Sequence, residues 1–231
     1  MNLRTLTTAS VVCMGVLVTG CGGDSPGASD AAPSTPRDQL LLSGSDLPAD
    51  AKPVNLPVER LREQLTDFAG VQANSTIDPQ ECRAPQLDLE AASKQALDEA
   101  AVTAVVAETA IFIEFVSGRG IDTHEFAQTE ARCAELTVSS EFEGERVDSR
   151  VRTESRTPPA ALAGIDAIAS YSTSTASVRD VPPTTTVSYA GWASLRGTTV
   201  AVRVTSLGDT LDEAKAEQFF ADAVRKVEDA P

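Results

Sequence analysis

Two short segments near the C-terminal end of the sequence constrain its fold more than any other feature. Residues 185–195 and 198–206 are rich in Thr and Val and flank the dipeptide Arg196-Gly197. Two such runs separated by two residues predict a β-hairpin with a tight turn. On one side of this hairpin the expected pairs are Tyr189 with Val204, Gly191 with Val202, and Ala193 with Val200. Trp192 and Ala201 share the opposite side. Because small residues oppose valines, we expect another element to pack closely there.

The element that we expect on the valine side is a helix at residues 211–228. Thr210 and Glu213 match the T-x-x-E capping box that marks the start of a helix. Apolar residues then recur at intervals of three and four, as in a helix with one buried face. These residues are Ala216, Phe219, Phe220, Ala223, Val224 and Val227.

Earlier segments add further helices and strands. A helix is predicted at residues 57–70, and its apolar stripe consists of Val58, Leu61, Leu65 and Phe68. Two more are predicted at 87–100 and 122–136, the second capped by Asp122. Strand-like patterns occupy 101–108, 110–117, 165–178 and the stretch after 138. We therefore expect one α+β domain, residues 39–231, with an antiparallel sheet and helices packed on one face.

The first twenty residues have the features of an export signal. An apolar run at residues 9–18 follows Arg4 and is too short to span the ~30 Å hydrocarbon core of a membrane. Val18-Thr19-Gly20 directly precedes Cys21, as in the lipobox before a lipid-modified bacterial cysteine. The alternative is an ordinary signal peptide cut nearby, although the A-x-A triplet of such a site is missing. The sequence predicts a signal peptide at 1–20 and lipidation at Cys21.

Residues 22–38 are rich in Gly, Ala, Ser and Pro and have no apolar face, as is typical of a flexible tether. With Cys21 they form a predicted lipidated N-terminus and disordered tether, 21–38. The expected location is therefore the cell membrane, lipid-anchored on its extracytoplasmic face. The net charge of −15 argues against a nucleic-acid partner, because basic residues are needed to neutralise phosphates.

Two cysteines remain once Cys13 is assigned to the signal peptide and Cys21 to the lipid. Cys82 and Cys133 are an even pair in an exported chain, which favours a disulfide. Closing a loop of about 50 residues stabilises a fold by roughly 4 kcal/mol on the chain-entropy model. Two buried free thiols are the alternative, and a metal site lacks a second pair of ligands.

The sequence offers little support for catalysis. His124 is the one histidine, and beside Asp122 and Glu125 it is expected to be an exposed residue of a first helical turn. The G-x-S-x-G, H-E-x-x-H, P-loop and G-x-G-x-x-G motifs do not occur. Ten aromatic residues are few for the stacking platforms of a glycosidase. We therefore expect no enzyme, no catalytic residues, no cofactor and no metal.

Trp192 is the main candidate for ligand binding, together with its neighbour Tyr189. If helices cover the valine side of the hairpin, Trp192 on the other side is exposed or lines a groove. The alternative is that Trp192 packs beneath the loop at Pro182-Pro183.

The order of elements resembles the extracellular sensor domain of mycobacterial PknH-type receptor kinases and of actinobacterial lipoproteins that share it. The likeness covers residues 40–227 and rests on Cys82 before a helix, the strand at 111–117, the cysteine-bearing helix at 124–136 and the ending GWASLRGTTVAVRV before the last helix. The kinase sensors carry two disulfides, whereas this chain has cysteines for one. The resemblance implies a sheet with helices on one side around a V-shaped cleft, and a role in sensing or binding.

We therefore expect a lipid-anchored, non-enzymatic, sensor-like lipoprotein of the cell envelope. Its partner besides the membrane is expected to be a small molecule or an envelope protein. An envelope lipid carrier is the alternative, and a hydrolase is less favoured.

A Cys21→Ser substitution tests the anchor. We expect an uncleaved precursor and complete loss of metabolic palmitate labelling, because the thiol is the acceptor of the lipid. Gel mobility and labelling of cells that produce the two forms measure both effects. Palmitate labelling that persists in Cys21→Ser would contradict the assignment.

Overall fold

The computed structural model describes residues 31–54, 57, 75–142 and 144–231. The predicted signal peptide, Cys21 and nearly all of the helix expected at 57–70 lie outside these residues. The helices are α1 Arg37–Leu40, α3 Arg83–Leu97, α4 Thr123–Arg132 and α5 Glu213–Glu228, with 3-10 turns at Gly44–Asp46, Gln80–Cys82 and Ala160–Leu162. None of the described helices is long and apolar enough to cross a membrane.

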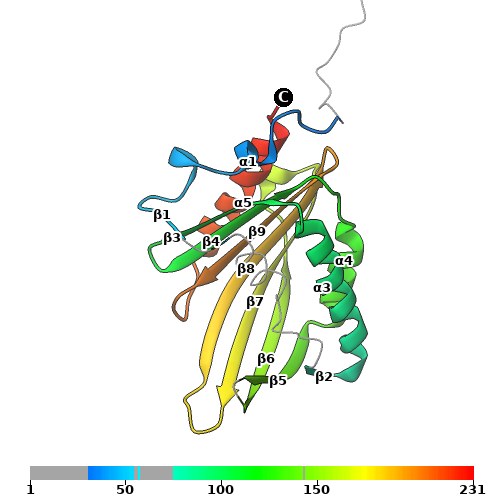
Figure 1. Cartoon of the computed structure of the whole chain (residues 1–231), viewed down its shortest axis with the longest axis vertical. Coiled ribbons are helices and arrows are strands. Elements are labelled where there is room, and N and C mark those ends of the chain that lie inside the picture. Colours follow the sequence, from blue (N-terminus) through cyan, green and yellow to red (C-terminus); the bar gives the residue numbers. More distant parts are fainter. Residues whose placement is uncertain (1–30, 55–56, 58–74, 143) are drawn as a thin grey trace, which may run out of the picture.

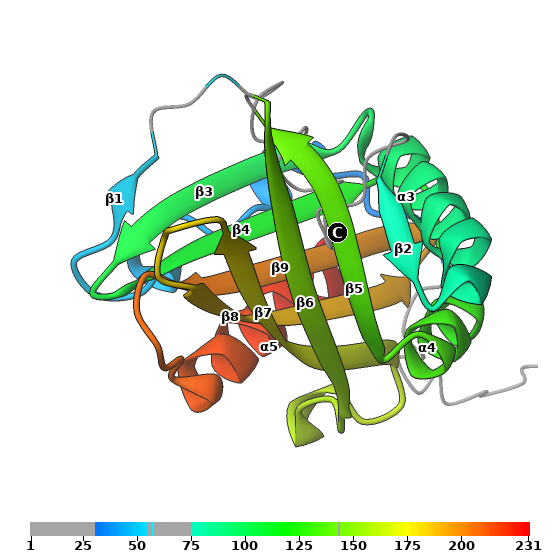
Figure 2. The same ribbon diagram turned by 90° about the horizontal axis from the view of Figure 1, so that it is seen from below.

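Within the described residues, nine strands form one antiparallel sheet in the order β1-β3-β4-β9-β8-β7-β6-β5-β2. The strands are β1 Lys52–Pro53, β2 Thr76–Asp78, β3 Ala101–Ala107, β4 Ala110–Ser117, β5 Glu135–Phe142, β6 Glu145–Arg156, β7 Asp166–Val178, β8 Thr184–Leu195 and β9 Thr198–Ser206. The sheet is strongly twisted, so that β5 and β6 run across β4 and β9 in Figure 2. Mixed helices and an antiparallel sheet confirm the predicted α+β class.

The hairpin of β8 and β9 has the register that the sequence predicts. Gly191 pairs with Val202 and Trp192 with Ala201, so these neighbours point to opposite faces of the sheet. Arg196 and Gly197 form the turn, and both have positive φ. A methyl group added at Gly191 would lie 2.6 Å from the Phe220 ring of α5. The close packing expected on the valine side is therefore confirmed, and its cause is Phe220.

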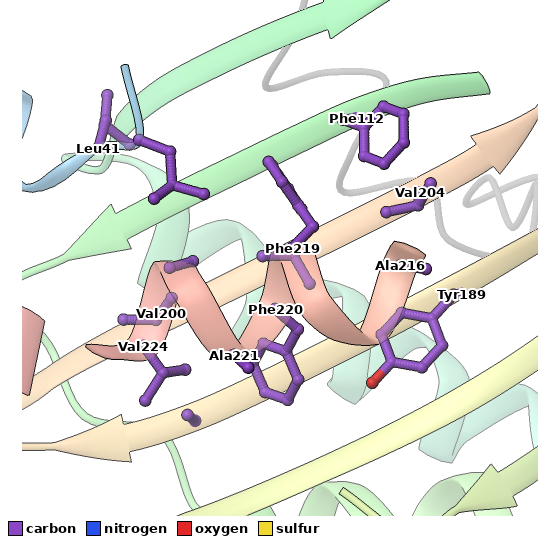
Figure 3. Close-up of a cluster of buried hydrophobic side chains, with 14 of the residues drawn as sticks. Leu41, Phe112, Tyr189, Val200, Val204, Ala216, Phe219, Phe220, Ala221 and Val224 are labelled. Carbon is purple, nitrogen blue, oxygen red and sulfur yellow. The ribbon is translucent and has the colours of Figure 1, made fainter. Parts of the chain in front are cut away.

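The main core lies between α5 and the valine side of the sheet (Figure 3). Phe219 packs edge-on against Phe112, with ring centroids 5.3 Å apart. The helix begins after Asp212, whose Oδ1 accepts a hydrogen bond from the Lys215 amide at 3.1 Å. The cap predicted at Thr210 is therefore wrong by two residues.

The helices cover both faces of the sheet (Figures 1 and 2). While α5 and α1 lie on the valine side, α3 and α4 pack on the opposite side. The expectation that all helices share one face is therefore wrong, and the reason is that Phe115, Trp192 and Ala201 make a second apolar surface that needs its own cover. The predicted cap of α4 is confirmed, since Asp122 Oδ1 accepts from the Glu125 amide at 2.9 Å. This helix ends at Arg132, earlier than expected.

The segment before α1 is held against one end of the domain. Arg196 donates hydrogen bonds to the carbonyl oxygens of Ala31, at 2.8 Å, and of Val227, at 3.2 Å. The Ser34 amide donates to the Pro231 carbonyl at 2.7 Å. Residues 31–38, expected to be part of the tether, therefore lie on the domain beside the end of α5 and the β8–β9 turn.

Glu114 of β4 is a fully buried carboxyl group in the main core. Its Oε2 accepts a hydrogen bond from the Leu42 amide at 2.8 Å, and Oε1 has no hydrogen-bond partner within the described part of the chain. Burial raises the pKa of Glu114 from 4.5 to about 7, against smaller lowering effects of the Leu42 hydrogen bond and of Lys226, while Asp46 adds to the rise. The folded protein therefore binds this proton more tightly than the unfolded chain.

The stability that this proton supplies is fully present below about pH 4.5 and is lost as the pH rises to about 7. Glu114→Gln keeps an acceptor for the Leu42 amide and cannot ionise. We expect its free energy of unfolding, relative to wild type, to rise by up to roughly 3 kcal/mol across this range. Urea unfolding at a series of pH values measures the difference, with Glu99→Gln at an exposed position as control. A pH-independent difference would contradict the burial account.

Candidate functional site

A cavity of about 660 Å³ lies between α3 and α4. Its volume falls within the roughly 300–1,000 Å³ of small-molecule sites. One wall is α3, the other is α4 with the loop before it, and Trp192 of β8 contributes from the sheet. We call this space the outer cavity.

The outer cavity combines an apolar interior with charged residues. The apolar residues are Ala84, Pro85, Leu89, Ala92, Ala96, Ile121, Phe126 and Trp192. The charged residues are Asp88, Arg119, Asp122, Glu125 and Arg132. Because both signs of charge occur, the site favours a ligand that is apolar in part over one with a large net charge.

Trp192 is only 2 % exposed and packs against α4. Its ring centroid is 4.9 Å from that of Phe126, with the ring planes tilted by 42°. The alternative position beneath Pro182-Pro183 is wrong, because Trp192 is eight residues along β8 from Thr184, about 26 Å at ~3.3 Å per residue. The structure thus agrees with the expectation that Trp192 lines a groove, because Trp192 is part of the lining of the outer cavity.

Tyr189 lies on the other face of the sheet, in the main core below α5 (Figure 3). Its ring centroid is 6.4 Å from that of Phe220. Burial is the main cause that raises the pKa of Tyr189, and Glu217 and Glu213 add to it. The structure therefore does not bring Tyr189 to the same cavity as Trp192. The two residues are three positions apart on β8, and side chains an odd number of positions apart along a strand point to opposite faces of the sheet.

The disulfide between Cys82 and Cys133 is present, with the two Cα atoms 5.7 Å apart. Cys82 immediately precedes α3, and Cys133 immediately follows α4. The disulfide therefore connects the two helical walls of the outer cavity at one end. The described residues contain no group of three His, Cys, Asp or Glu side chains placed to hold a metal ion.

A second, smaller cavity of about 50 Å³ lies beside the outer cavity on the same face of the sheet, and we call it the inner chamber. Glu130 of α4 lines it and accepts a hydrogen bond from the Ser170 hydroxyl at 3.2 Å. Burial raises the pKa of Glu130 from 4.5 to about 7, and the Ser170 hydrogen bond opposes this rise.

Sequence reasoning missed Glu130, although a usable signal exists. It lies four residues after Phe126 and three before Cys133, both of which point inward, so helical spacing places it on the buried side of α4. A carboxyl group on a buried face is the unusual feature. His124, by contrast, is exposed in the first turn of α4 as expected, with Nε2 2.8 Å from Gln128 Nε2.

Comparison with known proteins gives one distant structural likeness. No family model matches the chain, and no curated protein sequence matches it. The fold is similar to the crystal structure of an uncharacterized protein from Mycobacterium smegmatis, described as the Rv0999 ortholog. The two chains are 13 % identical, the TM-score is 0.45, and the likeness covers 80 % of this chain and 92 % of the other. A likeness this distant does not transfer a function.

Proposed function

We propose that the protein is a lipid-anchored, extracytoplasmic binding protein of the cell envelope, whose ligand occupies the outer cavity. The observation that carries the proposal is a cavity of about 660 Å³ with the protein's single tryptophan at its apolar interior. Cavities of this size and mixed lining are the usual sites of small ligands. The sensor-like role and the PknH-type likeness belong to this proposal and rest on the sequence.

Binding is favoured over catalysis by the tasks that the polar residues of the cavity already have. Asp122 caps α4 through the Glu125 amide, and Arg132 donates to the Thr129 hydroxyl at 3.4 Å. The cap contact occupies the Asp122 carboxylate, and the guanidinium of Arg132 stays protonated, so neither group is free to act as a general acid or base. We infer that the protein binds its ligand without converting it chemically.

The membrane attachment is proposed from the sequence around Cys21. Residues 21–30 would separate the lipid from Ala31, the first residue that the structure describes, and a coil of this length spans roughly 17 Å root-mean-square. Arg37 of α1 lies close to Gly118, just before the Arg119–Asp122 rim of the outer cavity. The Arg119–Asp122 end of the outer cavity would therefore face the tethered end of the domain, and the disulfide-linked end would face away from it.

An envelope lipid carrier is the second candidate. The apolar interior of the cavity next to Trp192 favours a carrier, because this interior suits an acyl chain. The charged residues around the same cavity favour a smaller, partly polar ligand instead. Both candidates place the ligand between α3 and α4.

The fluorescence of Trp192 tests the site, because it is the one tryptophan of the chain. We expect 1-anilinonaphthalene-8-sulfonate to bind and to quench Trp192 by energy transfer. Ala92 lines the cavity and its neighbour Ala91 does not, while both are exposed on α3. Ala92→Phe should weaken binding by about tenfold or more by filling the cavity, a loss of at least ~1.4 kcal/mol. Ala91→Phe should leave the affinity unchanged. Equal affinities of the two variants, or no binding, would contradict the site.

A further inference from the structure

A polar band divides the face of the sheet that α3 and α4 cover. One apolar cluster on this face contains Trp192, Phe115 and Phe126, and a separate one contains Val138 and Val151 with the disulfide. The inner chamber lies beside both, because its lining includes members of each cluster. A sheet face covered by helices is normally apolar throughout, so the break in apolar packing is the unusual feature.

The polar lining of the inner chamber comes from adjacent strands and both helices. It consists of Gln86, Glu130, Thr153, Ser170, Ser172, Ser188 and Arg203. The floor follows a row of paired residues, Thr153 with Ser172 and Ser172 with Ser188, and the first pair is hydrogen-bonded at 3.2 Å. Hydroxyl groups at the positions where a covered sheet carries Val or Ile imply a requirement other than core packing.

The chamber offers both donors and acceptors to a small group. Hydroxyls donate and accept, the guanidinium of Arg203 donates, and Glu130 does either according to its protonation. A space of about 50 Å³ holds one or a few atoms beyond hydrogen. An ionised group placed there would lose most of its hydration, which disfavours it relative to an uncharged one.

The inner chamber adjoins the outer cavity. Leu89 of α3 and Phe126 of α4 line both spaces, so these two side chains form the partition between them. Phe126 also contacts Trp192, and a displacement of its ring would change the surroundings of the indole. A ligand that reaches past Phe126 would therefore occupy both spaces.

We propose that the inner chamber is the polar subsite of the ligand site: it binds an uncharged hydroxyl or amide group of an amphiphile whose apolar part lies in the outer cavity beside Trp192. This inference rests on the proposed function and specifies the chemical class of the ligand. The hydroxyl row of β6, β7 and β8 selects the head group, while α3 and α4 enclose the apolar part.

The test uses 1-octanol and octanoate, two probes with one chain and different head groups, with Trp192 emission as readout. Ser172→Val fills the chamber and removes a hydroxyl. Ser174→Val is the matched control, because Ser174 lies two residues further on the same face of β7 and does not line the chamber. We expect octanol to bind more tightly than octanoate to wild type. Ser172→Val should weaken octanol binding by roughly tenfold, as for one or two lost hydrogen bonds, and Ser174→Val by less than about twofold.

Ser170→Ala is a second variant that removes the hydroxyl bonded to Glu130 with little change in volume, and it too should weaken octanol binding. Thermal unfolding identifies any variant that fails to fold. If one of the two chamber variants, Ser172→Val or Ser170→Ala, fails to fold, the octanol affinity of the other tests the proposal. Equal octanol affinities of the chamber variants and Ser174→Val, or a preference for octanoate, would overturn the subsite. If 1-anilinonaphthalene-8-sulfonate still binds in that case, the proposed function stands and only the subsite fails.

Discussion

The register of β8 determines how both layers of helices pack. Gly191 allows Phe220 of α5 to approach the sheet on one face, and Trp192, the next residue, packs against Phe126 of α4 on the other. Because side chains alternate along a strand, a slip of one residue would turn the indole toward α5 and place Gly191 or Ala193, both small, opposite Phe126 of α4. The main core and the candidate site therefore depend on the same pairing of β8 with β9.

This dependence explains which parts of the molecule could be predicted from the sequence. The two-residue turn at Arg196-Gly197 fixes the pairing of neighbouring strands, so the partners of Gly191 and Trp192 followed from local pattern alone. The covering of both faces did not follow, because periodicity shows that a helix has an apolar side without showing which part of the sheet it meets. The paired cysteines indicated a bond, but its role in joining the ends of α3 and α4 required the fold.

The candidate site was harder to predict than the fold, since it depends on side chains from distant segments. Trp192 was identifiable as a rare aromatic residue on the side of the hairpin away from α5. The outer cavity also needs residues of α3, and the inner chamber combines Glu130 with hydroxyls of three strands. In the sequence these Ser and Thr residues look like the exposed side of a strand, because nothing local indicates that a helix covers them. Strand alternation places Tyr189 in the main core, on the opposite face of the sheet from Trp192.

We propose that the space between α3 and α4 receives a ligand in the cell. Native mass spectrometry of the protein, released from the membranes of the cells that make it, tests this claim most directly. The account predicts a non-covalent adduct of one amphiphilic molecule per chain, lost when Ala92 is replaced by Phe and retained when Ala91 is replaced. A spectrum that contains the polypeptide with its covalent modifications alone, or an adduct equally retained by both variants, would contradict it.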